Sequence, residues 1–222
     1  MKARFIHPEW PAPASVTAYT TTRLAGEETF LAVPAGVQMK QVHGIAVVDA
    51  ASASDDVAAD ACFSRRAGIA CRVVTADCLP ILLCNRAGNE VAAIHAGWRG
   101  LQAGVVEATL AQLQTAPTEL LAWLGPAISQ THYEVGGELR EAFVATAAAS
   151  MEAQVESCFY PSGDRFHADM AGLARLRLEF AGLLHIYGGE HCTYADPGLF
   201  YSYRRDGAGT GRMSSVIYFS ES

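Results

Sequence analysis

Three short apolar runs near the middle of the chain constrain its fold more than any other feature. They cover residues 69–75, 79–84 and 91–95, and each is rich in residues that favour β-strands. A turn-like segment, residues 85–89, separates the second run from the third. The third run lacks polar alternation, which predicts a central strand that is covered on both faces. We therefore expect these runs to form strands of a buried sheet.

Strand-like and helical segments alternate along the rest of the chain. The other strand-like runs cover residues 15–22, 41–48, 120–124, 199–203 and 212–219. Helical patterns follow Gly100 and cover residues 137–151, and Asp169 could cap another helix that ends near Phe180. Because strand-to-strand steps alternate with helical crossovers, the expected fold is a single α/β domain, residues 1–222, with mixed β-sheets flanked by helices.

Composition argues against two classes of partner. Half of the 222 residues are apolar and 18% are charged, so a large core can form. The formal net charge of −7 argues against a nucleic-acid partner, because phosphate backbones bind to basic surfaces. No run reaches the length of a membrane span, and the N-terminal residues show no signal-peptide pattern. We therefore expect a cytoplasmic protein with no membrane partner.

Cysteine spacing points to free thiols rather than to a zinc ribbon. None of the six cysteines forms a C-x-x-C pair, and Cys71 and Cys84 lie in apolar runs that favour core packing. Cys78 differs, because Asp77 and Pro80 interrupt the apolar pattern around it. A polar, interrupted position inside an apolar run indicates a role beyond packing.

Two histidines lie at the edges of strand-like runs. His95 ends the third apolar run just before a glycine turn and a helix, which is where ligands bind in open α/β sheets. His43 lies in another strand-like run and also precedes a glycine. With Cys78 these histidines would form a zinc site whose three protein ligands leave one coordination position open, as in catalytic sites. In the alternative interpretation, His95 is a hydrogen-bonded core histidine and His43 a surface residue.

The residues after His95 suit a close approach to a ligand. Gly97 and Gly100 would let the backbone turn sharply and come near it. Arg99 could present its planar guanidinium to a phosphate or a carboxylate near the helix N-terminus. The alternative is that Trp98 is a core aromatic residue and Arg99 a surface charge.

Short motifs are spread over nearly the whole chain. They read T-T-R at residues 21–23, Q-V-H-G at 41–44, T-A-D-C at 75–78, H-A-G-W-R-G at 95–100, L-G-P-A-I at 124–128, Y-R-R-D at 203–206 and T-G-R at 210–212. Together they resemble the bacterial YfiH/YlmD family, also called the laccase-domain or multicopper polyphenol oxidase-like family. The resemblance implies an α/β fold of two packed sheets flanked by helices, related to the fold of cysteine hydrolases.

The resemblance also implies a site and an activity. The family's metal ligands map onto His43, Cys78 and His95, the three residues selected above from their positions. The activity attributed to the family is phosphorolysis of adenosine, inosine and S-methyl-5′-thioadenosine, with deamination of adenosine as a second activity. An older label is copper-dependent polyphenol oxidation, and some members are linked to peptidoglycan editing.

The histidine content argues against a copper oxidase. The chain has seven histidines and no H-x-H pair, whereas a multicopper oxidase needs several coppers and many histidine ligands. A single site of one cysteine and two histidines suits zinc, which lowers the pKa of bound water, and copper is the less favoured metal. Asp77, next to Cys78, is then a candidate general base or a residue that supports the ligands.

Phosphorolysis also requires a binding site for phosphate. The available cations are Arg23, Arg99, Arg204 and Arg205, with the glycine-rich residues 207–211 as support. In the alternative interpretation these arginines are exposed or structural. The chain departs from the family in one respect, since the interval between Gly26 and Gln41 is unusually short. A segment missing there could alter the choice of substrate.

Together these observations predict a zinc-dependent purine nucleoside phosphorylase with adenosine deaminase side activity, which acts as a monomer on purine nucleosides and phosphate. A competing hypothesis is a cysteine hydrolase that acts on a peptidoglycan precursor, with Cys78 as the nucleophile and a histidine as the base. A third hypothesis is a non-catalytic binding module, which the short interval before Gln41 suggests. A polyphenol oxidase is disfavoured.

Overall fold

The larger sheet of the fold has six strands. In spatial order they are β12 (His185–Gly188), β8 (Leu120–Leu124), β6 (Leu79–Asn85), β7 (Val91–Ala96), β4 (Ala61–Ser64) and β3 (Val47–Asp49). β6 is antiparallel to both β7 and β8, whereas β12 is parallel to β8 and β3 is parallel to β4. The computed structural model, which describes residues 3–25 and 34–221, therefore has the mixed strand pairing expected from the sequence.

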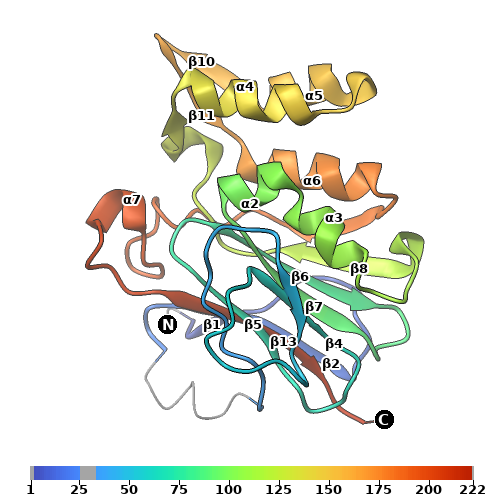
Figure 1. Cartoon of the computed structure of the whole chain (residues 1–222). Coiled ribbons are helices and arrows are strands. Elements are labelled where there is room, and N and C mark those ends of the chain that lie inside the picture. The colour runs from blue at the N-terminus through green and yellow to red at the C-terminus, as the bar shows by residue number, and fades with distance from the viewer. Residues whose placement is uncertain (1–2, 26–33, 222) are drawn as a thin grey trace.

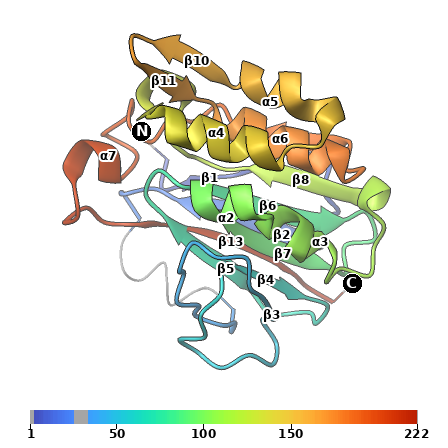
Figure 2. The ribbon, with the colours of Figure 1, turned by 45° about the horizontal axis from the view of Figure 1, so that its top comes forward.

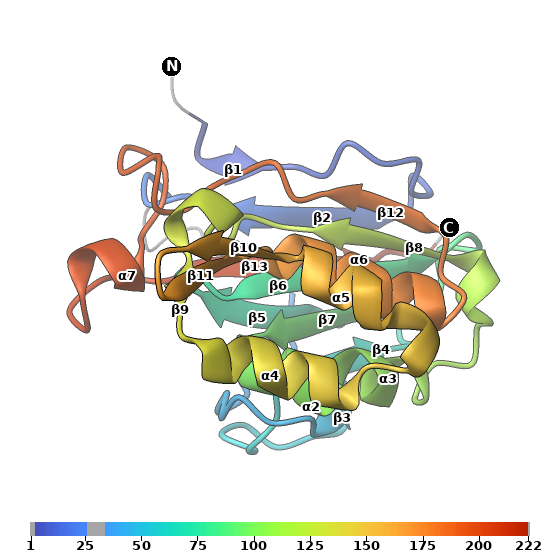
Figure 3. The ribbon, with the colours of Figure 1, turned by 90° about the horizontal axis from the view of Figure 1, so that it is seen from above.

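A second sheet packs against one face of the first. Its strands are β1 (Phe5–Ile6), β2 (Val16–Thr21), β13 (Met213–Phe219) and β5 (Cys71–Thr75), in that spatial order, and all of its pairs are antiparallel. Leu82 and Trp123 of the larger sheet meet Val73 and Ile217 of this one in a buried cluster. β2 and β13 pair side by side although they come from opposite ends of the chain (Figure 3).

Helices cover the other face of the six-stranded sheet (Figure 1). The nearer ones are α2 (Trp98–Ala103), α3 (Val105–Leu110) and α6 (Met170–Phe180), and α4 (Gly137–Thr146) and α5 (Glu152–Ser157) lie beyond them. A small sheet of β10 (Phe159–Ser162), β11 (Arg165–Ala168) and β9 (Glu134–Val135) adjoins these helices, and α7 (Tyr203–Asp206) lies to one side (Figure 2). None of the described helices is long and apolar enough to cross a membrane.

Strand β6 shows why the central strands need continuous apolar runs. All seven of its residues are buried, because helices cover one face of the strand and the second sheet covers the other. Ile81 and Leu83 face the core under the helices, while Leu82 and Cys84 face the core between the two sheets. The predicted α/β fold with packed, mixed sheets and flanking helices is confirmed, as is the helix that Asp169 caps through its side chain.

Some sequence predictions of single elements are wrong. Residues 41–48 were expected to form one strand, but β3 begins only at Val47 and the turn before it holds His43 at a positive φ of 61°. Residues 199–203 form no strand, because the backbone N–H groups of residues 199 and 200 bond to Asp196 and Ser202 caps α7. Residues 26–33 of the short interval before Gln41 lie outside the described residues.

Candidate metal centre

Strand pairing brings the predicted ligands to one end of the six-stranded sheet. Pro80 of β6 lies opposite His95 of β7, so Cys78, just before β6, is close to the end of β7. β4 is antiparallel to β7, which places Asp60, just before β4, beside His95. β3 runs parallel to β4, so the loop that carries His43 reaches the same end of the sheet.

The three predicted ligands lie together in space. The ligand atoms of His43, Cys78 and His95 are all within 4.8 Å of one another, and no other such group occurs among the described residues. Cys78 Sγ lies 3.8 Å from His43 Nε2. A tetrahedral zinc ion with bonds of about 2.3 Å to sulfur and about 2.1 Å to nitrogen would hold these atoms about 3.6 Å apart. The donor set and its spacing therefore fit zinc.

The carboxylate of Asp60 bonds to both histidine residues of this group, through the ring of His95 and the backbone of His43. Its carboxylate is fully buried and accepts a 2.8 Å hydrogen bond from His95 Nδ1, together with bonds from the backbone N–H groups of Val42, His43 and Gly44. Burial would raise the pKa of Asp60, but the bonds from His95 and from the Gly44 N–H outweigh it, so the pKa is lowered. Sequence reasoning missed this residue, although it directly precedes a strand as Cys78 does.

The electrostatics of the site favour a thiolate at Cys78. Burial opposes the charged form, but hydrogen bonds to His43 and His95 and their positive charge lower the pKa of Cys78 to about 6. Burial likewise opposes charge on His95, but the bonds to Asp60 and Cys78 raise its pKa to about 9. Without a metal, the site therefore stabilises a thiolate beside an imidazolium. The thiolate is also the form that binds metal ions.

Two glycines let helix α2 approach the His43 loop. A Cβ atom on Gly97 would lie 2.6 Å from His43 Cδ2 and 3.4 Å from Cys78 Sγ. A Cβ atom on Gly100 would lie 2.8 Å from the carbonyl oxygen of Gly44. The start of helix α2 thus lies close to the loop that carries His43. Any larger residue at Gly97 or Gly100 would push this loop away.

Gln41 fastens the start of the same loop to β5. Its side-chain Nε2 donates to the carbonyl oxygen of Val74, and its Oε1 accepts from the Val74 N–H, both at 2.8 Å. A side-chain amide carries one donor group and one acceptor, as a peptide unit does, so it can pair with a strand edge. Gln41 therefore holds the His43 loop against the second sheet.

A cavity of about 670 Å³ opens over the three candidate ligands. Part of its wall is aromatic or apolar, formed by Trp98, Ile128, Tyr133, Met170 and Tyr203. Its basic lining residues are Arg99, Arg204 and Arg212. The guanidinium of Arg99 lies 4.4 Å from the ring centre of Trp98, and that of Arg204 lies 5.2 Å from the ring centre of Tyr133. Within residues 3–25 and 34–221, none of the three arginines pairs with a carboxylate.

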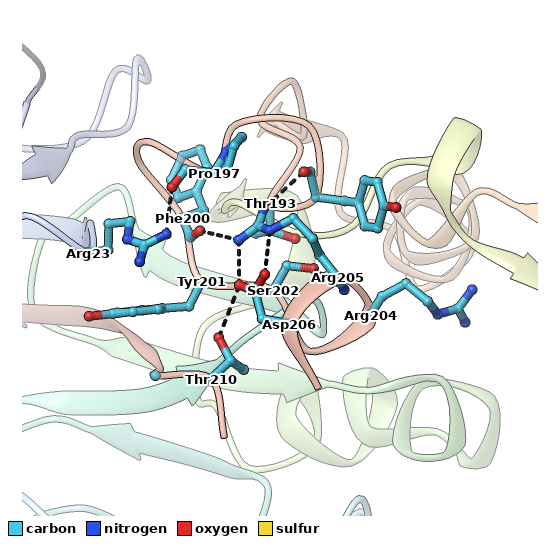
Figure 4. A network of polar contacts seen from close by, with 12 residues as sticks. Arg23, Thr193, Pro197, Phe200, Tyr201, Ser202, Arg204, Arg205, Asp206 and Thr210 are labelled. Carbon is cyan, nitrogen blue, oxygen red and sulfur yellow. Dashed lines mark hydrogen bonds and ion pairs between the residues drawn. The ribbon is translucent and has the colours of Figure 1, made fainter. Parts of the chain in front are cut away.

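Two of the arginines predicted to bind phosphate do not line this cavity. Arg205 lies inside a polar network, where it donates to three backbone carbonyl groups between residues 193 and 200 and pairs with Asp206 (Figure 4). Arg23 donates to a carbonyl group of the same loop. Arg204 points away from this network (Figure 4) and lines the cavity. Arg212 also lines it and was missed as a site residue.

Asp77 lines the cavity but is already engaged by the protein. It has a positive φ of 87°, and its carboxylate accepts bonds from the hydroxyls of Thr193 and Ser202 and from the backbone N–H of Arg204. Both carboxylate oxygens therefore hold the segment that leads into α7. This arrangement suits support of the site better than proton transfer.

Comparisons with known proteins find similarity over nearly the whole chain. Residues 14–220 match the family model described as multi-copper polyphenol oxidoreductase laccase. A purine nucleoside phosphorylase of Pseudomonas aeruginosa is 43% identical, and the match covers 98% of this chain and 99% of that protein. The purine nucleoside phosphorylase YfiH of Escherichia coli is 42% identical, with 97% and 99% covered.

Solved structures show the same fold. A Neisseria meningitidis protein superposes with a TM-score of 0.88 at 38% identity, covering 99% of this chain and 100% of that one. YlmD from Geobacillus stearothermophilus superposes with a TM-score of 0.86 at 27% identity, covering 100% and 98%.

Proposed function

The chain belongs to the YfiH/YlmD family of laccase-domain proteins, and from this membership we propose that it is a purine nucleoside phosphorylase. The observation that carries the proposal is the whole-length similarity to two bacterial proteins of that name, at 43% and 42% identity. The proposed substrates are adenosine, inosine and S-methyl-5′-thioadenosine. Inorganic phosphate is the second substrate and takes the ribose as a 1-phosphate.

Zinc is the proposed metal of the site formed by His43, Cys78 and His95. One thiolate and two imidazoles are ligands that zinc favours, and three protein ligands leave a position open. Bound zinc supplies Lewis acidity and lowers the pKa of a bound water. Copper is the less favoured metal, because all seven histidines are described and only one group with metal-binding spacing occurs among the described residues.

The proposed phosphate site consists of cavity arginines. Arg99, Arg204 and Arg212 line the cavity, and none has a carboxylate partner among the described residues. Arg204 and Arg212 each donate to backbone carbonyl groups, which leaves their positive charge unneutralised and attractive to an anion. Arg23 and Arg205 have a different proposed role. They hold the loop before α7 and so fix the position from which Arg204 reaches the cavity.

The rest of the cavity suits a nucleoside. Its volume of about 670 Å³ lies within the range of roughly 300–1,000 Å³ that is typical of small-molecule sites. The rings of Trp98, Tyr133 and Tyr203 provide aromatic surface for a purine base, and Ile128 and Met170 add apolar wall. Adenosine deamination is the proposed side activity, because a purine in this cavity would lie beside the candidate metal ligands.

Metal analysis combined with a phosphate-dependence assay tests this function. We expect the purified protein to contain zinc and to release hypoxanthine from inosine only when phosphate is present. Cys78→Ala should lose both zinc and turnover, because one of three ligands is gone. Cys192→Ala is the matched control, since Cys192 is another partly buried thiol near a histidine, 3.5 Å from His132 Nδ1, but does not line the cavity.

Two outcomes would contradict the proposal. One is full zinc content and turnover in Cys78→Ala. The other is the absence of phosphate-stimulated base release from the zinc-loaded wild-type protein. Nucleoside binding without turnover in that protein would instead support the non-catalytic binding module.

A cysteine hydrolase acting on a peptidoglycan precursor is the second candidate. It is favoured by the Cys78 thiol, whose pKa is lowered to about 6 and whose Sγ lies 3.8 Å from His43 Nε2. A thiol mechanism predicts that zinc-free protein is active and that iodoacetamide abolishes this activity. The phosphorylase proposal predicts that zinc-free protein is inactive before alkylation and recovers when zinc is added.

A further inference from the structure

We propose that Asp60 is a positioning residue that holds both metal-binding histidines through a single carboxylate. The inference rests on the metal site of the proposed function. Asp60 orients the ring of His95 directly, and it shapes the turn that carries His43 through the backbone. One residue outside the ligand set thus fixes two of the three ligand directions.

Two buried hydrogen bonds join Asp60 to His95. His95 Nδ1 lies 2.8 Å from Asp60 Oδ1, and the two side chains are 4% and 0% exposed. The backbone N–H of His95 also donates to the carbonyl oxygen of Asp60 at 2.7 Å. Turning the ring to exchange its two nitrogens would break this buried hydrogen bond to a carboxylate, which is costly. The ring therefore presents Nε2 toward Cys78 and the cavity.

The second link runs through three successive N–H groups. Asp60 accepts from the backbone of Val42, His43 and Gly44 at 3.2, 2.9 and 2.7 Å. These bonds hold His43 at a φ of 61°, a conformation that residues other than glycine rarely adopt. The His43 side chain is exposed, and its ring lies edge-on to the ring of His95, with ring centres 4.8 Å apart. The place of this ring beside His95 therefore depends on the turn that Asp60 holds.

The carboxylate has little capacity left for any other role. Four hydrogen bonds from the protein meet its two oxygens, which offer about four acceptor positions. Asp60 therefore acts through the histidines and does not bind the metal or the substrate itself. Carboxylates that bond to the far nitrogen of a metal-binding histidine fix its orientation and strengthen it as a ligand.

Zinc affinity of the full chain, measured by competition with a chelator, tests the role of Asp60. We expect Asp60→Asn to weaken zinc binding by about 10–100-fold, the usual effect of removing such a partner. Glu90→Gln is the matched control, because Glu90 is another buried carboxylate that accepts several protein hydrogen bonds but lies outside the cavity lining. It should bind zinc as wild type does, even if both variants lose stability. Wild-type affinity in Asp60→Asn would overturn the inference.

The outcomes separate this inference from the proposed function. A wild-type chain that binds no zinc refutes the proposed metal site itself, whereas equal binding by wild type and Asp60→Asn refutes only the role of Asp60. If Asp60→Asn does not fold, nitrogen-15 NMR of the histidines in zinc-loaded wild type decides. A proton on His95 Nδ1 with Nε2 bound to zinc is expected, and zinc bound at Nδ1 would overturn the inference.

Discussion

At the residue scale, Gly97 sets the distance between helix α2 and the candidate metal ligands. Its φ and ψ of −66° and 155° suit any residue, so the space around it, and not its backbone, requires glycine. A methyl group here would lie 2.6 Å from His43 Cδ2. We therefore expect Gly97→Ala to displace His43 and to weaken zinc binding and turnover by at least about tenfold, the lower end of the effect of disturbing ligand orientation.

Titration of zinc and an assay of inosine phosphorolysis measure this effect. Gly137→Ala is the control, because a Cβ atom on Gly137, outside the cavity lining, would meet only Cε2 of Phe166, at an ordinary contact distance of 3.9 Å. It should leave both quantities unchanged. Wild-type zinc affinity in Gly97→Ala would show that the His43 loop moves away at no cost to the site.

A single site residue could be predicted where its neighbours in the sequence mark it, and not where only the folded structure does. Cys78 and His95 stood out because each lies beside a long apolar run in the sequence. Asp60 gave no such signal, since it ends a loop that contains other aspartates and only strand pairing turns it inward. Arg204 and Arg205 are neighbours in the sequence, yet Arg204 lines the cavity and Arg205 joins the polar network. Only the position of α7 decides this difference.

At the scale of elements, Glu90 fastens the β6–β7 hairpin to the loop after α3. It lies just before β7, is 2% exposed, and accepts bonds from the backbone of Gln114 and Thr115 and from Arg65. Burial would raise the pKa of Glu90, but these bonds outweigh it and lower the pKa below the ordinary value of 4.5. Because the folded-state pKa is depressed, the stabilisation is complete above the unfolded-state pKa and is lost as pH falls through the folded-state value.

We expect Glu90→Gln to lower the free energy of unfolding by about 1–3 kcal/mol at pH 7, because an amide cannot accept all of these bonds. The difference from wild type should shrink as the pH falls below about 4, where the wild-type carboxyl is protonated as well. Urea unfolding at a series of pH values measures both effects. Glu156→Gln, which removes a partly exposed ion pair with Arg140, should cost about 1 kcal/mol or less. A difference for Glu90→Gln that is independent of pH would contradict this account.

Elements with strong sequence patterns were predicted, and short ones were not. β6, β7 and β8 are continuous apolar runs because each is covered on both faces, so their pattern needs no partner to be recognised. β4, β9, β10, β11 and β12 are two to four residues long and form because neighbouring strands offer pairing edges. The expected strand over residues 199–203 failed because Ser202 begins a helix there, a local capping signal that an apolar pattern does not show.

At the scale of the whole molecule, the two hydrophobic cores share one sheet. Alternate residues of β6 belong to the core under the helices and to the core between the sheets, so neither core can open without exposing the other. We therefore expect one cooperative transition in calorimetry, in agreement with the predicted single domain of residues 1–222. Two separate transitions would contradict it.

Zinc should raise the temperature of that transition. Zinc at about 100 times its Kd would add about 2.7 kcal/mol, because its three ligands come from separate segments that only the folded chain brings together. At roughly 2–4 °C per kcal/mol for a chain of this size, the Tm should rise by roughly 5–11 °C. Calorimetry of Cys78→Ala with and without zinc is the control, and the Tm of this variant should not rise.

The side chain of Gln41 has a consequence beyond the metal site. β5 is an edge strand of its sheet, and free strand edges invite pairing with other chains. By occupying both hydrogen-bonding groups of Val74, the Gln41 amide acts as a one-residue substitute for a neighbouring strand. The contact that holds the His43 loop thereby also covers two hydrogen-bonding groups that this edge would otherwise offer to another chain.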